Sequence, residues 1–197
     1  PPHDDYRKVF DQPPPDLDRG SPRVGKEPKT RQSNESLDSA ECRALSLMLH
    51  NRQKLEDLKL WPGRITEQFF CEGPHRQIFN ALKASTAYDE AQSHFSVDNV
   101  EAQMASSLLE RLHQEGPLHN LDDVKVSATI AEVLYWTAKH RHDGIYAEAT
   151  KSSDLKAAQE LAEIHQLLSD LIDSLDPFSK VADHLLEWLQ SKEKGES

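Results

Sequence analysis

LDDVKVSATIAEVLYWTAKHRHDGIYAEAT, residues 121–150, is the stretch that decides how the rest of the chain is arranged. Its first half, up to Ala138, is apolar on nearly every side, and a helix of that kind has to be surrounded by other elements. From Lys139 onward the stretch is polar, with Ile145 and Tyr146 as its last large apolar side chains. We therefore predict one long helix that begins inside a core and continues through solvent, joining that core to a second body.

Several shorter helices are predicted on the N-terminal side of this stretch. The first begins at Asp38 or Ser39, because either side chain can cap a helix. Another begins at Pro74, since proline suits the first helical position. A third is capped by Ser96 and ends at Gly116. Strand-like alternation and hairpin turns between strand-like runs are missing, so the predicted fold is all-α, with a multi-helix bundle as its body.

Two further helices are predicted after the long one. Leucine and isoleucine repeat as the a and d positions of a heptad from Leu161 to Leu175, and Val181, Leu185 and Trp188 can face them across a tight turn. The C-terminal part is therefore an antiparallel helical hairpin. Gly144 is the weakest internal point of the long helix, and we expect bending there.

Composition divides the chain into three parts. Residues 1–38 hold seven of the eleven prolines and are expected to be a disordered, proline-rich linker. Tyr6, Val9 and Phe10 are exceptions in it, and they fit the end of an upstream domain or a short docking motif as well as a linker. Residues 39–144 form the helical body, and 145–197 the end of the connecting helix plus the hairpin. Because the first residue is not methionine, we expect a piece of a longer protein.

Charge and cysteine usage exclude several classes of function. The chain has a net charge of -11, and residues 39–197 carry 26 acidic against 16 basic side chains. Such a surface repels phosphate backbones, so no direct nucleic-acid binding is expected. No apolar run approaches the roughly 18 residues of a membrane span. The two cysteines are far apart in the sequence, which favours a reducing cytoplasm over a disulfide framework.

Catalytic and metal-binding motifs are missing from the sequence. Glu110-x-x-His113 has the spacing of di-iron bundles, but those sites need the pair twice, and we find it once within a predicted helix. Phosphate-loop, dinucleotide, serine-hydrolase and zinc-protease signatures do not occur. Both cysteines lie in apolar surroundings typical of small buried side chains. We therefore expect neither an enzyme nor a metal or other cofactor.

The apolar faces of the hairpin are wider than one partner helix can cover. Leu167 and Ile172 lie beside the heptad seam, and Leu186 lies off the main stripe of the last helix. The surplus either packs onto the body or forms a docking surface for another protein, and the sequence favours neither. Under the second alternative the partner-binding residues are Leu167, Ile172, Phe178, Leu186, Trp188 and Leu189.

Four segments carry a resemblance to a known family. They are ECRALSLMLHN at 41–51, ITEQFFCEGPHRQIFNALKA at 65–84, SSLLERLHQEGP at 106–117, and IAEVLYWTAKHRH at 130–142. With the terminal hairpin, they resemble the C-terminal, helicase-interacting domain of bacterial replicative DNA primases. The resemblance implies a non-catalytic module of the primosome that binds the N-terminal region of the replicative helicase through its hairpin. It would stimulate the helicase and couple primer synthesis to DNA replication at the fork.

Two alternatives remain open. The segment at 65–84 also resembles the N-terminal domain of replicative helicases. In a helicase, a phosphate loop would follow this domain, whereas here a proline-rich segment precedes the module. A helical bundle that binds a small ligand or metal in its core is the alternative from another class. It would need convergent polar groups on facing helices, and the predicted stripes are apolar apart from Thr137 and His165.

Overall fold

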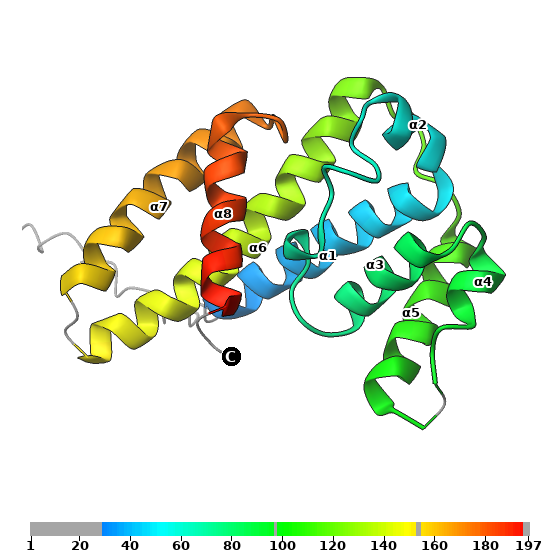
Figure 1. The fold of residues 1–197 in the computed structure, drawn as a ribbon, viewed down its shortest axis with the longest axis horizontal. Helices are drawn as coiled ribbons and strands as arrows, with labels where there is room; N and C mark the ends of the chain where they lie inside the picture. The colour runs from blue at the N-terminus through cyan, green and yellow to red at the C-terminus, as the bar shows by residue number, and fades with distance from the viewer. Residues whose placement is uncertain (1–28, 97, 153–154, 195–197) are drawn as a thin grey trace, which may run out of the picture.

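The computed structural model describes residues 29–96, 98–152 and 155–194, which form an all-α fold without strands in these ranges (Figure 1). The α-helices are α1 (Lys29–His50), α2 (Arg52–Asp57), α3 (Pro74–Ala84), α4 (Tyr88–Gln92), α5 (Val100–Glu115), α6 (Asp123–Ser152), α7 (Leu155–Ser174) and α8 (Lys180–Lys194). A short 3-10 turn, η1, spans Glu67–Phe69. The sequence-based prediction of the fold class is confirmed.

The long helix is α6, which runs without interruption from Asp123 to Ser152. It packs against α1 over its first half and against α7 over its second, as Figure 1 shows. Ile130 and Leu134 are fully buried, as expected, whereas Val124 in the first turn is 78% exposed. Most residues of the second half, from His140 to Ser152, are exposed, as the polar sequence predicted. One face is nevertheless covered by α7, and His142 on it is only 8% exposed.

The first helix begins earlier than the sequence indicated, at Lys29 instead of Asp38 or Ser39. Leu37 and Ala40 are buried and extend the apolar stripe of α1 toward its N-terminus. Residues 29–38, placed in the predicted linker, are therefore helical. Averaging composition over the whole segment hid this stripe. The remainder of the linker prediction, residues 1–28, lies outside the described residues.

Helix α5 begins at Val100, with Asn99 as its N-cap accepting a hydrogen bond from the Glu101 amide at 2.8 Å. The prediction of a start at Ser96 was wrong, while the end at Gly116 is confirmed by that glycine's φ of +76°. The buried face of α5 combines two alanines near its start with two leucines farther along. Its members are Ala102, Ala105, Leu109 and Leu112.

Helices α7 and α8 pair as predicted, but they do not project from the body. The seam residues of α7 are buried: Leu161, Ile164, Leu168 and Leu171. Helix α8 lies beside α7 and also contacts α6 and η1 (Figure 1). Arg64 pairs with Asp183 at 2.6 Å, and Arg76 pairs with Glu193 at the same distance. Leu186 is buried in this arrangement, whereas Leu167 and Ile172 remain partly accessible.

Gly144 provides a first test of the structure. It is exposed, lies inside α6, and an added Cβ would meet nothing within 4 Å. Gly144→Ala should therefore raise the free energy of unfolding by about 1 kcal/mol, measured in urea. The matched control is Gly116→Ala, which should lower it by about 1–3 kcal/mol because a φ of +76° strains residues with a side chain. A loss of stability in Gly144→Ala would show that α6 is not helical there.

Glu160 gives a test that depends on pH. Its carboxylate lies 2.5 Å from Lys192 Nζ and accepts a hydrogen bond from Trp188 Nε1 at 2.9 Å. The Lys192 contact, against partial burial, lowers the pKa of Glu160 below its usual 4.5. A lowered carboxyl pKa stabilises the fold above that value, and the stabilisation is lost as the pH falls through it.

Wild type should therefore exceed Glu160→Gln in stability by up to about 1 kcal/mol at neutral pH, a figure discounted because the side chain is 40% exposed. The difference should disappear well below the usual carboxyl pKa. Urea unfolding of both proteins across the acidic range measures it. A difference independent of pH would mean that packing, not the ion pair, accounts for the effect.

Candidate functional site

Three of the six predicted partner-binding residues lie in the interior. Leu186 is 8% exposed, Trp188 is 7% and Leu189 is 6%, and all three belong to the main hydrophobic core. Besides pairing with α7, helix α8 contacts α6 and η1, and a heptad pattern that considers two helices alone does not include those contacts. These side chains therefore support the position of α8 and are not free surface.

The other three predicted residues remain accessible to different degrees. Leu167 is half-buried, Ile172 is 38% exposed and Phe178 is 47% exposed. Phe178 lies in the turn between α7 and α8, where the guanidinium of Arg64 sits 5.7 Å from the centre of its ring. Ile172 lies at the C-terminal end of α7 and lines a groove. Accessible apolar surface on this helix pair is thus concentrated on α7 and the turn.

The groove lies between α6 and α7 and has a volume of about 700 Å³. Leu161 and Leu168 of the α7 seam contribute to its apolar lining, together with Tyr135 and Tyr146 of α6. Tyr146 is 57% exposed, so its ring is open to a partner. The groove thus combines apolar and aromatic walls with solvent access.

Polar groups of α6 form one part of the groove. Lys139 Nζ donates to Asp143 Oδ2 at 2.8 Å. Burial opposes ionisation of Asp143, but hydrogen bonds from Lys139 and His142 outweigh it and lower the pKa of this carboxyl. His142 Nε2 lies 3.1 Å from the carbonyl oxygen of Leu161, so this nitrogen donates across to α7. This last bond joins the two walls of the groove, while the other two lie within α6.

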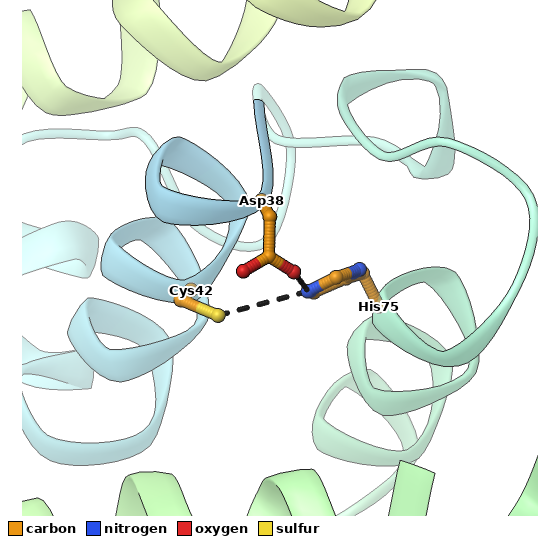
Figure 2. Close-up of side chains that lie close together, drawn as sticks. All are labelled: Asp38, Cys42 and His75. Carbon is orange, nitrogen blue, oxygen red and sulfur yellow. Dashed lines mark hydrogen bonds and ion pairs between the residues drawn. The ribbon is translucent and has the colours of Figure 1, made fainter. Parts of the chain in front are cut away.

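A second group of side chains, unforeseen in the sequence, joins α1 to α3 (Figure 2). Asp38 and Cys42 lie four residues apart on α1 and point toward His75 in the first turn of α3. His75 Nε2 is 3.2 Å from Asp38 Oδ1 and 3.6 Å from Cys42 Sγ. In the part of the chain that the structure describes, no other group of three His, Cys or acidic side chains offers such converging ligand atoms. We call these three residues the Asp-Cys-His cluster.

The buried side chain of Glu41 contacts the His75 ring of the Asp-Cys-His cluster. Its Oε2 lies 3.2 Å from His75 Nδ1, and its Oε1 accepts the backbone N–H of Cys71 at 2.7 Å. Burial raises the pKa of Glu41 to about 7, and burial also lowers the pKa of His75. The lowered pKa favours the neutral imidazole form of His75.

Both cysteines are protonated thiols at neutral pH. Burial raises the pKa of Cys42 to about 11, although Arg111 Nη2 lies 3.7 Å from its sulfur. Burial likewise raises the pKa of Cys71 to about 12. Since the thiolate is the reactive form, neither side chain has the environment of a nucleophile.

The sequence contained one signal for the Asp-Cys-His cluster, the spacing of Asp38 and Cys42 on one helical face. The predicted helix start near Asp38 obscured it, and His75 comes from another helix, so its approach follows from tertiary packing. The Glu110-x-x-His113 pair that we considered instead has a different environment. His113 stacks on Tyr88, with ring centres 3.9 Å apart.

Leu186 and Ile172 differ in burial, so the same substitution should affect stability differently at the two positions. Leu186→Asp should lower the free energy of unfolding by at least about 3 kcal/mol, because it places an unpaired carboxylate in the core. Ile172→Asp should cost about 1 kcal/mol or less, since the side chain is 38% exposed. Thermal and urea unfolding measure both. Equal stability of the two variants would mean that α8 does not pack as described.

Comparisons with protein families, with curated proteins and with solved structures give no match to this chain. Within the described residues, none of the helices combines the length and the apolar character needed to cross a membrane.

Proposed function

We propose that this chain is a non-catalytic docking module that binds the N-terminal region of a replicative DNA helicase. Three features support the proposal: the four segments that resemble the C-terminal domain of bacterial primases, the long helix α6, and the antiparallel pair that follows it. In this role the chain would recruit and stimulate the helicase while a primase catalytic domain makes the primer. It would act in the cytoplasm and contact DNA only through its partners.

The observation that carries the proposal is the α6–α7 groove, which belongs to the connecting helix and the hairpin. An amphipathic helix binds a groove of this kind by placing apolar side chains at spacings of three and four residues into it. Ile172 and Tyr146 line the groove and are partly exposed, so apolar side chains of a partner can pack against them. The Lys139–Asp143 ion pair offers polar contacts beside them. We assign the occupant as an amphipathic helix from the N-terminal region of the helicase.

The position of α8 decides how the proposal should be tested. Removing α8 would expose the seam of α7 and the face of η1 that α8 covers, so a truncated chain would lose its own core. Loss of binding after truncation would then say nothing about the contact. Single substitutions on exposed residues avoid this difficulty.

The test is binding of the reduced chain to the N-terminal region of the cognate helicase, measured by fluorescence anisotropy. Ile172→Asp should weaken binding about tenfold or more, because an anchor at the centre of an interface commonly contributes about 2 kcal/mol. Far-ultraviolet circular dichroism and thermal unfolding of the same variant should confirm that it is folded.

Two controls make the same apolar-to-acidic change on other exposed surfaces. Val124→Asp, in the first turn of α6 and 78% exposed, should bind as wild type does. Met104→Asp lies on α5, is 57% exposed, and should also bind normally. If Met104→Asp weakens binding while Ile172→Asp does not, the contact lies on the body. If wild type itself does not bind, the assignment of the partner is wrong.

A further inference from the structure

Two of the three separations between the ligand atoms of the Asp-Cys-His cluster match those of one metal coordination sphere. Cys42 Sγ and His75 Nε2 are 3.6 Å apart, His75 Nε2 and Asp38 Oδ1 are 3.2 Å apart, and all three atoms lie within 4.8 Å of one another. In tetrahedral zinc sites with bonds of about 2.0–2.3 Å, neighbouring ligand atoms are separated by about 3.3–3.6 Å. The two measured separations differ from these values by no more than about 0.1 Å.

The helices hold these atoms in place. Asp38 and Cys42 lie one turn apart on the same face of α1, a spacing that presents both side chains to one point. His75 lies in the first turn of α3, where Gly73 and Pro74 set the direction in which the helix begins. Because each element packs in the core through its other face, the positions of the ligands are fixed by the fold.

Glu41 orients His75 for metal binding. In protein metal sites the coordinating histidine commonly donates its second ring N–H to a carboxylate, which fixes the tautomer and the ring plane. Here Nδ1 faces the buried Oε2 of Glu41 at 3.2 Å, which leaves the lone pair of Nε2 directed at Cys42 and Asp38. Glu41 is itself fixed by the backbone N–H of Cys71. Glu41 is therefore a positioning residue and not a ligand.

The ligand set also selects the kind of ion. One thiolate and one imidazole favour zinc over magnesium or calcium, which prefer oxygen ligands alone. A thiolate and the Asp38 carboxylate together balance the charge of a divalent cation. Arg111 Nη2, 3.7 Å from Cys42 Sγ, is placed to donate to the thiolate. The Asp38 side chain is 60% exposed, so an ion has a route in, and a fourth position faces water.

We propose that Asp38, Cys42 and His75 bind one zinc ion that fastens α1 to α3. On binding, the sulfur–hydrogen bond of Cys42 breaks, the proton passes to solvent, and a sulfur–zinc bond replaces it. The imidazole of His75 binds through Nε2 and the carboxylate of Asp38 through one oxygen. Water completes the tetrahedron. The site is independent of the proposed helicase contact, which lies on other helices.

The test is titration of the reduced full chain with Co²⁺, a coloured substitute for zinc, followed by displacement with Zn²⁺. One equivalent should produce a thiolate-to-cobalt charge-transfer band in the near ultraviolet and the strong visible bands of tetrahedral cobalt. Cys42→Ser should abolish the charge-transfer band. Glu41→Gln should weaken binding about 10–100-fold, the usual effect of losing a carboxylate partner of a ligating histidine.

Controls address folding and non-specific binding. Asp38→Asn changes a largely exposed side chain, so it should stay folded while binding Co²⁺ about tenfold more weakly or worse. Cys71→Ser keeps the backbone N–H that Glu41 accepts, and His119→Gln removes a histidine outside the cluster, so both variants should leave the bands intact. Zn²⁺ should raise the melting temperature of wild type but not that of Cys42→Ser. The proposal is overturned if the charge-transfer band is absent, persists in Cys42→Ser, or disappears in Cys71→Ser.

Discussion

The packing of α6 against both α1 and α7 is the constraint on which the rest of the structure depends. Ile130 and Leu134 are fully enclosed on the α1 side, and each such side chain contributes about 1.5–3 kcal/mol when removed from water. On the other half, Leu161 and Leu168 of α7 face α6 and close the same core. A single helix therefore serves both the body and the C-terminal pair, and neither part has a complete core without it.

Apolar packing alone does not determine how neighbours align along α6, and buried polar contacts supply that information. Thr137 donates to the carbonyl oxygen of Phe69 at 2.8 Å, which fixes η1 against the middle of α6. His142 reaches the carbonyl oxygen of Leu161 and fixes α7 in the same way. Sliding either neighbour by one turn would leave a buried donor without a partner, at a cost of about 1–3 kcal/mol. The α6–α7 groove thus has a defined shape before any partner binds.

Local patterns in the sequence predicted what local physics determines. The length of α6, the heptad seam of α7, proline at the start of α3 and glycine at the end of α5 all follow from neighbouring residues, and the structure has each of them. The position of α8 does not follow, because it depends on Arg64 and Arg76, more than a hundred residues earlier in the chain. The approach of His75 to α1 is undetermined for the same reason. The predicted starts of α1 and α5 were wrong by several residues, because more than one residue near each start could have been a cap.

Folding during translation is constrained by the place of α8 in the core. Leu185 of α8 is as fully buried as Leu45 of α1, although the two are separated by most of the described chain. While a ribosome is still making the segment after α7, the seam of α7 and the face of η1 are open to water and to other nascent chains. Exposed surface of this kind promotes aggregation and chaperone binding. Synthesis that stops before α8 would therefore give a product recognised by quality control, not a smaller working module.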